Sequence, residues 1–152
     1  NCGGYEGLEA LKLLDGVVDI YLPDMKFNDD QVAKRLTGAP EYVKHNRAAI
    51  REMHRQVGDL LADEDGIARR GLIIRHLVLP RGLAGSVGVL EFIAREISQN
   101  TAISLMSQYF PAHQAHESPE LSRRINREEY EEAVAALEEL GLSTGWVQSE
   151  PL

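Results

Sequence analysis

The stretch that decides the fold is Val17-Val18-Asp19-Ile20-Tyr21-Leu22-Pro23-Asp24-Met25-Lys26. Its first part is apolar and rich in β-branched residues, which is typical of a strand that is buried on both faces. Its last part places a carboxylate and an ammonium two residues apart. Side chains at positions i and i+2 of an extended segment point to the same side. The sequence therefore predicts that Asp24 and Lys26 project together just beyond the carboxyl end of a buried strand.

That placement suggests a ligand site, because α/β folds bind ligands at the carboxyl ends of their strands. One acidic and one basic side chain suit a ligand with both charges, such as the ammonium and carboxylate of an amino acid. The alternative is an exposed ion pair in a loop after a strand, which contributes little to stability. The spacing alone leaves both interpretations open.

Composition limits the classes of function. The 152 residues carry a net charge of −8, which argues against sequence-independent binding to a nucleic-acid backbone. No apolar run reaches the roughly 20 residues of a membrane span. Cys2 is the single cysteine, so we expect no intrachain disulfide, a reducing cytoplasmic location, and no cluster or zinc site built from this chain alone.

Periodicity predicts an alternation of helices and strands. The expected helices are 5–14, a short one through Leu36 capped by Asp29 or Asp30, 41–61, 87–98, and 127–140 with Asn126 and Glu129 in a capping box. The expected strands are 17–22, 71–80 and 102–106. Because alternation implies parallel strands joined by right-handed crossovers, we expect an α/β fold that forms roughly half of a (βα) barrel.

Further polar residues fall at the ends of the expected strands: Asn1, Arg75, Gln108 and Tyr109. If the strands are parallel, these side chains meet Asp24 and Lys26 at one rim. Arg75 is informative because an arginine within so apolar a strand needs an anion or acceptors. It can serve a ligand, or it can form a structural pair with Asp24 or Asp19.

The remaining titratable residues favour structural roles. His76 alternates with Arg75, so it should face the helices as a packing residue. His113 and His116 lie three residues apart without a third ligand at a suitable spacing, which favours a solvated loop over a metal site. Cys2 has no recognisable catalytic partner. We therefore predict neither a catalytic residue nor a metal ligand within this chain.

Five segments, in this order, resemble a known family. They are Asn-Cys-Gly-Gly-Tyr-Glu (1–6), Val-Asp-Ile-Tyr-Leu-Pro-Asp-Met-Lys (18–26), Arg-Gln-Val-Gly (55–58), Gly-Leu-Ile-Ile-Arg-His-Leu-Val-Leu-Pro (71–80) and Leu-Met-Ser-Gln-Tyr-Phe-Pro (105–111). The chain resembles, over nearly its whole length, the carboxyl-terminal half of radical SAM proteins of the pyruvate formate-lyase activating enzyme-like family. That resemblance implies a partial (βα)6 barrel, a 4Fe-4S cluster and S-adenosylmethionine. It also implies an oxidoreductase that generates a 5′-deoxyadenosyl radical.

The resemblance assigns cofactor-binding positions residue by residue. Asp24 and Lys26 match the Asp-x-Lys strand end that holds the amino-acid part of S-adenosylmethionine, and Arg75 matches the arginine before the Val-Val-Pro segment. Asn1 stands where the family has an acidic residue, and the family's histidine after the last strand falls at Gln108 and Tyr109. The Cys-x3-Cys-x2-Cys motif and the Gly-Gly-Glu segment have no counterpart in this sequence. We therefore expect residues 1–152 to be a fragment without the amino-terminal cluster-binding half, inactive by itself.

Two rival hypotheses and two partners complete the expectations. The chain could be a binding module without a cluster, or an ordinary α/β enzyme that uses Asp24 and Lys26 on an amino-acid ligand. A glycyl-radical protein is the partner that the resemblance implies. An unpaired edge strand at the amino-terminal end favours a homodimer of the fragment, because exposed edges tend to pair. The loop 107–124 is the expected place for substrate specificity.

Overall fold

The computed structural model describes residues 1–148, which form helices and strands in alternation. The α-helices are α1 (Leu8–Lys12), α2 (Asp30–Thr37), α3 (Tyr42–Val57), α4 (Ser86–Phe92) and α5 (Arg127–Glu139). The strands are β1 (Ile20–Tyr21), β2 (Leu61–Ala62), β3 (Ala68–Leu77), β4 (Ala102–Met106) and β5 (Gly145–Val147). Three short helical turns are η1 (Pro80–Gly82), η2 (Ile93–Ile97) and η3 (His113–Glu117).

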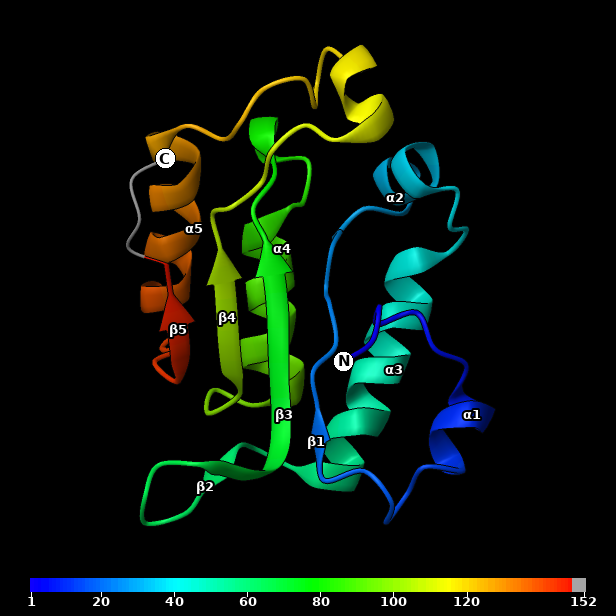
Figure 1. Cartoon of the computed structure of the whole chain (residues 1–152), viewed down its shortest axis with the longest axis vertical. Helices are drawn as coiled ribbons and strands as arrows, with labels where there is room; N and C mark the ends of the chain where they lie inside the picture. Colours follow the sequence, from blue (N-terminus) through cyan, green and yellow to red (C-terminus); the bar gives the residue numbers. More distant parts are fainter. Residues whose placement is uncertain (149–152) are drawn as a thin grey trace.

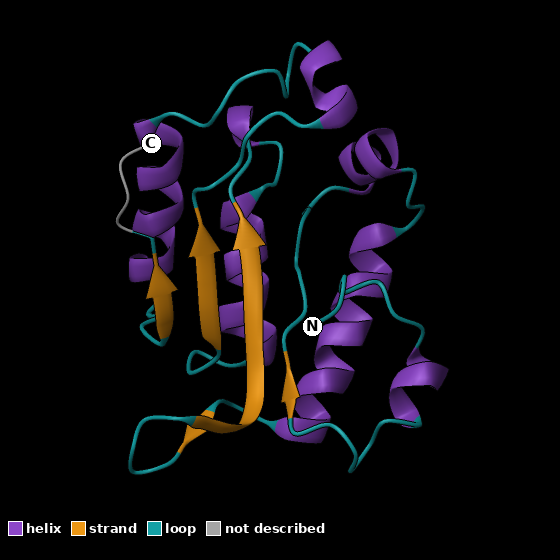
Figure 2. Ribbon diagram, viewed as in Figure 1, coloured by secondary structure: helices purple, strands orange, loops and turns teal. Residues whose placement is uncertain are grey.

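Within residues 1–148 the strands form one sheet in the order β1-β3-β4-β5, and all of these neighbours are parallel (Figure 1). β2 adds an antiparallel hairpin to the start of β3. Helices α3, α4 and α5 lie behind the sheet, whereas none of the helices in the described part of the chain lies in front of β3, β4 and β5 (Figure 1 and Figure 2). The protein is thus an α/β structure with a mostly parallel sheet, which is compatible with a partial α/β barrel.

The central strand β3 shows how the two faces differ. Leu72, Ile74 and His76 point toward the helices and are fully buried. The alternate residues Arg75 and Leu77 point to the opposite face and are only partly buried. This period of two follows from strand geometry, and it places Arg75 on the face that the helices leave uncovered.

The expected strands are confirmed, with shifted bounds. β1 is shorter than the expected 17–22, but the chain stays extended beyond it, where Pro23 pairs with Cys2 and Asp24 pairs with Arg75. β3 begins before Gly71, because residues from Ala68 onward pair with β2. The expected helix 41–61 was too long: Gly58, with a φ of 73°, ends α3 after Val57. Leu61 then enters β2, so its apolar side chain fitted the helical pattern only by chance.

Two helix starts follow the sequence signals. The Asp29 carboxylate accepts hydrogen bonds from the amides of Gln31 and Val32 and caps α2. Asn126 and Glu129 form the reciprocal capping box that was predicted for α5. The short strand β5 was not predicted, since Gly145-Trp146-Val147 carries no apolar run or alternation long enough to identify it. Among residues 1–148, no helix has the length and apolar character needed to cross a membrane.

Candidate functional site

The Asp24-Met25-Lys26 segment lies where β1 ends, beside the carboxyl-terminal half of β3. Asp24 and Arg75 are register partners in a parallel bridge. The amide of Met25 donates to the carbonyl of Arg75 at 2.9 Å, and the amide of Arg75 donates to the carbonyl of Pro23 at 2.9 Å. Because register partners in a parallel sheet share a face, the side chains of Asp24 and Arg75 lie next to each other.

Asp24 sits between two cations. Arg75 donates to Asp24 Oδ1 through Nε at 2.8 Å, and its Nη2 lies 2.6 Å from the same oxygen as an ion pair. Lys26 Nζ lies 3.1 Å from the other carboxylate oxygen, Oδ2. The Asp24 side chain is 16% exposed, that of Arg75 30% and that of Lys26 46%, so all three remain within reach of a ligand.

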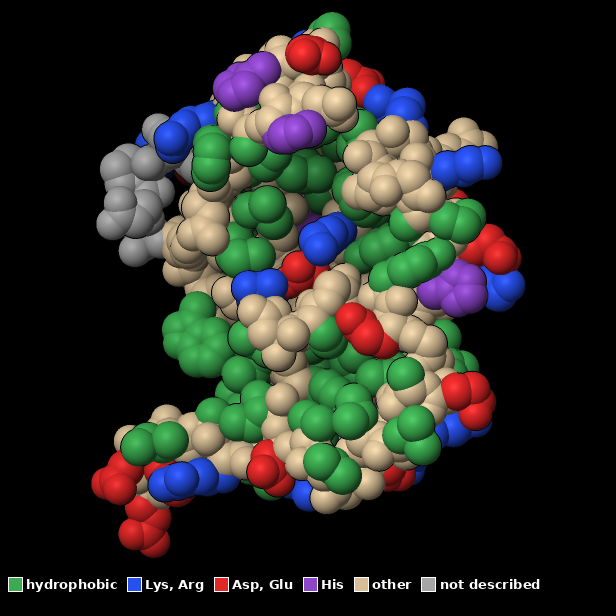
Figure 3. Space-filling view, turned by 45° about the vertical axis from the view of Figure 1, so that its right-hand side comes forward, with side chains coloured by type: hydrophobic (Ala, Val, Ile, Leu, Met, Phe, Trp, Pro, Cys, Tyr) green, Lys and Arg blue, Asp and Glu red, His purple; other side chains and the backbone are tan. Residues whose placement is uncertain are grey.

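These three residues border a cavity of about 240 Å³. Its lining consists of Asp24, Lys26, Phe27, Arg75, Leu77, Leu79, Met106 and Gln108. On this side of the molecule, Figure 3 shows basic and acidic side chains close together amid hydrophobic ones. The cavity thus combines a charged corner, made of Asp24, Lys26 and Arg75, with an apolar wall, made of Phe27, Leu77, Leu79 and Met106. Such an arrangement is typical of small-molecule sites.

The charges determine which ligand suits the cavity. Two cationic side chains and one carboxylate leave an excess of one positive charge in the corner. A ligand carboxylate can approach Lys26 and Arg75, and a ligand ammonium can approach Asp24. Because Arg75 already fixes one oxygen of Asp24, the carboxylate is oriented before a ligand arrives. An amino-acid moiety fits this pattern, and the apolar wall can receive an uncharged remainder.

The six residues expected at the site are only partly brought together. Asp24, Lys26, Arg75 and Gln108 line the cavity, whereas Asn1 and Tyr109 do not. Asn1 is exposed beside Cys2, which pairs with Pro23. The Tyr109 hydroxyl donates to the carbonyl of Leu121 at 2.8 Å, which ties this side chain to the loop before α5.

The apolar wall was not predicted from the sequence, since the expected site consisted of polar residues and a tyrosine. Phe27 follows Lys26 directly, and Leu77 lies two residues beyond Arg75 on the same face of β3. Met106 is the register partner of Leu77 on β4. The period of two could have identified Leu77, but the contribution of Met106 depends on the β3–β4 register, which the sequence does not reveal.

His76 is fully buried between the site and the helices, as predicted. Its Nδ1 lies 2.6 Å from the carbonyl of Met25, and its Nε2 lies 2.9 Å from the Ser86 hydroxyl. A carbonyl only accepts, so Nδ1 carries the proton and Nε2 accepts from Ser86. Burial lowers the pKa of His76, so this neutral form persists at neutral pH. The imidazole thus holds the Asp24-Met25-Lys26 segment from behind.

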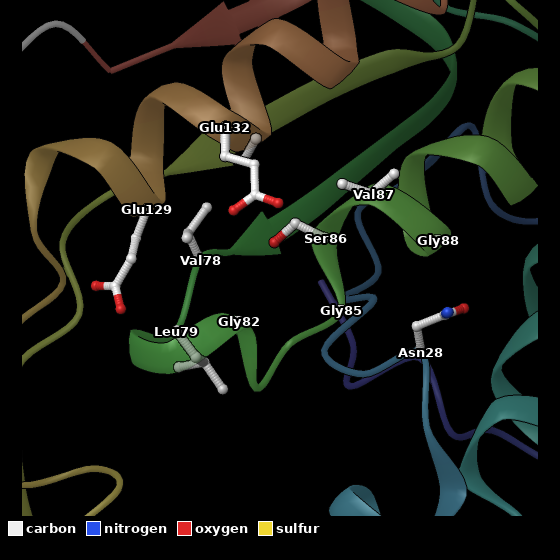
Figure 4. Close-up of a pocket in the computed structure, with 11 residues that line it drawn as sticks. Asn28, Val78, Leu79, Gly82, Gly85, Ser86, Val87, Gly88, Glu129 and Glu132 are labelled. Atoms are coloured by element: carbon white, nitrogen blue, oxygen red, sulfur yellow. The ribbon is translucent and has the colours of Figure 1, made fainter.

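A second cavity, of about 160 Å³, is lined in part by Ser86, the hydrogen-bond partner of His76 (Figure 4). Ser86 lines it together with the loop before α4 and with Glu129 and Glu132 of α5. Glu129 is occupied structurally: its carboxylate accepts from the amides of Arg81 and Asn126 and from the Arg123 guanidinium. These contacts lower the pKa of Glu129 to about 2. This cavity has no basic side chain and does not suit a zwitterion.

His113, His116 and Cys2 line neither of these two cavities. Within residues 1–148, no three His, Cys, Asp or Glu side chains are grouped so that they could hold a metal ion. His113 and His116 lie in η3, between β4 and α5. Burial raises the pKa of the Cys2 thiol, which disfavours the thiolate that a nucleophile needs.

Comparison with known proteins finds a relative without a described activity. The chain is 33% identical over 146 residues to an uncharacterized protein of Methanocaldococcus jannaschii, MJ0674. The matched region is 93% of this chain but only 38% of that relative, so the chain spans well under half of the relative's length. No family model matches the chain, and no solved structure matches it. The relative's description names no activity.

Proposed function

We propose that residues 1–152 form the S-adenosylmethionine-binding part of a radical SAM protein that resembles pyruvate formate-lyase activating enzymes. The observation that carries this proposal is the cavity that Asp24, Lys26, Arg75 and Gln108 share. The family resemblance assigns Asp24 and Lys26 to the amino-acid part of the cofactor, and it places Arg75 among the cofactor-binding positions. Independently of the resemblance, the charge pattern of the cavity supports a ligand with an amino-acid moiety, which S-adenosylmethionine has.

The proposed roles follow from position. Asp24 accepts hydrogen bonds from the ligand ammonium, while Lys26 and Arg75 bind its carboxylate. Arg75 also keeps the Asp24 carboxylate turned toward the cavity through its contacts at 2.6 and 2.8 Å. The apolar wall excludes water from the uncharged part of the ligand, which strengthens the ionic contacts beside it.

The 4Fe-4S cluster cannot be assigned to these residues, since Cys2 is the single cysteine of the sequence. In the family that the chain resembles, three cysteines hold the cluster, which supplies an electron for cleavage of S-adenosylmethionine. In this proposal a segment outside residues 1–152 provides those cysteines. We propose that the complete protein is an oxidoreductase, that the present residues alone are inactive, and that a glycyl-radical protein is its substrate.

The first experiment is isothermal titration of the chain with S-adenosylmethionine. We expect saturable binding that weakens at least about tenfold in Lys26→Met and in Arg75→Gln, because each substitution removes a charged partner of the ligand carboxylate. Lys44→Met is the matched control, since Lys44, like Lys26, pairs with one carboxylate, but with that of Glu41 on the surface. Equal affinities in the wild type and both site variants contradict the proposal.

The second experiment addresses catalysis. A protein that joins this chain to a three-cysteine segment is reconstituted with iron and sulfide without oxygen, reduced, and assayed for 5′-deoxyadenosine. Product formation that is lost in Asp24→Asn supports the proposal. Binding without cleavage supports the alternative of a module without radical chemistry. Binding of free methionine, but not of S-adenosylmethionine, supports an α/β protein for a simple amino acid.

A further inference from the structure

Two buried side chains of α3 hold the backbone of the candidate site. Tyr42 and Asn46 are four residues apart, so they lie one helical turn apart on the same face of α3. Both are buried: Tyr42 is 4% exposed and Asn46 is 0% exposed. Both reach the Asp24-Met25-Lys26 segment, but neither lines the cavity.

The Tyr42 hydroxyl oxygen accepts a hydrogen bond from the backbone amide of Lys26 at 2.9 Å. Burial raises the pKa of Tyr42 to about 12, so the hydroxyl stays protonated throughout the usable pH range. Two aromatic rings pack on the Tyr42 ring: Tyr5 stacks on it with a centroid distance of 5.8 Å, and Phe27 meets it edge-on with a centroid distance of 5.6 Å. A rigid acceptor therefore sets the position of the Lys26 backbone.

Asn46 holds the other end of the segment. Its Nδ2 donates to the carbonyl of Asp24 at 3.0 Å and to the carbonyl of Gly4 at 2.7 Å. Both partners are acceptors, so this orientation of the amide is the one that chemistry allows. Within residues 1–148, Asn46 Oδ1 is buried without a hydrogen-bond partner, which is unfavourable. The residue thus retains an unsatisfied atom while its nitrogen joins the Gly4 turn to Asp24.

His76 completes the set, because its Nδ1 donates to the carbonyl of Met25. Three side chains from two elements thus bind successive backbone groups: the carbonyl of Asp24, the carbonyl of Met25 and the amide of Lys26. Pro23 comes just before this segment, and no helix or regular strand includes residues 24–26. The side-chain contacts therefore add to the backbone hydrogen bonds that the amides of Asp24 and Met25 donate to the carbonyls of Cys2 and Arg75.

We infer that Tyr42 and Asn46 are positioning residues, which fix the spacing between the Asp24 carboxylate and the Lys26 ammonium and thereby the affinity for a zwitterionic ligand. This inference rests on the proposed function and extends it to residues that do not touch the ligand. Tyr42 acts through Lys26, and Asn46 acts through Asp24. A substitution of Tyr42 should therefore weaken binding only while Lys26 is present, and a substitution of Asn46 only while Asp24 is present.

A double-mutant cycle on the intact chain tests this inference with S-adenosylmethionine as the probe. Tyr42→Phe removes one oxygen atom and keeps the stacked ring, so it is chosen over a replacement of the fully buried Asn46. We expect Tyr42→Phe and Lys26→Met each to weaken binding about tenfold. The double variant should bind within about twofold of Lys26→Met alone. Effects that multiply in the double variant overturn the inference, because a general structural defect would act regardless of Lys26.

Tyr21→Phe is the matched control, since Tyr21 is 5% exposed and its hydroxyl donates to Gln56 at 2.8 Å, outside the cavity lining. Hydrogen exchange of the Lys26 amide provides a readout without a ligand. Its protection should fall in Tyr42→Phe and stay unchanged in Tyr21→Phe, and unchanged protection in Tyr42→Phe overturns the inference. A wild-type chain that does not bind S-adenosylmethionine overturns the proposed function. In that case the exchange result alone decides whether Tyr42 fixes the Lys26 backbone.

Discussion

The Arg75 guanidinium donates a hydrogen bond to one oxygen of Asp24 and forms an ion pair with that same oxygen, and the other carboxylate oxygen faces Lys26. The pair joins the ends of two parallel strands that are 51 residues apart in the sequence. With Arg75 30% exposed, solvent screens the pair, so its contribution to stability is expected to be small. An effect on ligand binding explains the Asp24–Arg75 pair better than an effect on stability does, because the pair holds the Asp24 carboxylate in a fixed orientation at the cavity.

Asp24→Asn tests that explanation. The substitution keeps the shape of the side chain but leaves two cations without an anion, so the ligand ammonium loses its partner. We expect binding of S-adenosylmethionine to weaken at least about tenfold, and the free energy of unfolding in urea to change by less than about 1 kcal/mol. Asp63→Asn, which breaks the surface pair with Arg69, is the control and should leave binding unchanged. A large loss of stability with unaltered binding would contradict the functional explanation.

The sequence revealed the charged corner of the site because strand periodicity is local. Asp24, Lys26 and Arg75 could be placed on one rim from the period of two and from parallel alternation alone. The apolar wall depends on the pairing of β3 with β4, which no local pattern encodes. Tyr109 was expected at the rim, but its hydroxyl instead bonds to Leu121, a contact that depends on the irregular path of loop 107–124.

Helix ends show the same division between local and tertiary signals. The capping box of α5 and the cap of α2 were predictable because each involves side chains within three residues of the helix start. The end of α3 was missed because Leu60 and Leu61 continue an apolar pattern that Gly58 interrupts. Neither Tyr42 nor Asn46 could be recognised, since their partners lie 16 and 22 or more residues away.

Gly4→Ala should disrupt the turn that Asn46 joins to the site. Gly4 has a φ of 78°, and a Cβ there would lie 2.0 Å from the carbonyl oxygen of Asp24 and 2.4 Å from Asn46 Nδ2. We expect a loss of at least about 2 kcal/mol in urea unfolding, since left-handed strain adds to displacement of backbone. Gly3→Ala is the matched control, because no atom lies within 4 Å of the Cβ that it would add. Similar stabilities of the two variants would show that the turn adapts.

Asn126→Ala should destabilise α5 without affecting the candidate site. Asn126 Oδ1 accepts from the amide of Glu129 at 2.8 Å, and the Glu129 carboxylate accepts from the amide of Asn126 at 2.8 Å. Loss of such a cap costs about 1 kcal/mol. Urea unfolding should report that loss, while affinity for S-adenosylmethionine stays at the wild-type value. A change in affinity would reveal coupling between α5 and the cavity.

The outer edge of β1 remains a predicted dimer interface. Among residues 1–148, Cys2 alone pairs with this side of the strand, through its bridge to Pro23. An edge with free backbone groups tends to pair with a second edge. Light scattering at increasing concentration should therefore show a mass that rises from 16.9 kDa toward twice that value. A constant mass of one chain at high concentration is the result that excludes the dimer.

His76 should make stability depend on pH in a defined window. Burial lowers its pKa below the ordinary 6.5, so the unfolded chain binds a proton at a higher pH than the folded protein does. Between 6.5 and the lowered pKa of the folded state, stability therefore falls as the pH falls, by up to about 1.4 kcal/mol per pH unit. His76→Asn retains a donor near the Nδ1 position but does not titrate. We expect urea unfolding between pH 7 and pH 5 to show a smaller loss of stability in this variant than in the wild type. The range from pH 7 to pH 5 is chosen because most carboxylates remain ionised there. If the free energy of unfolding depends equally on pH in both proteins, His76 is not the group that responds.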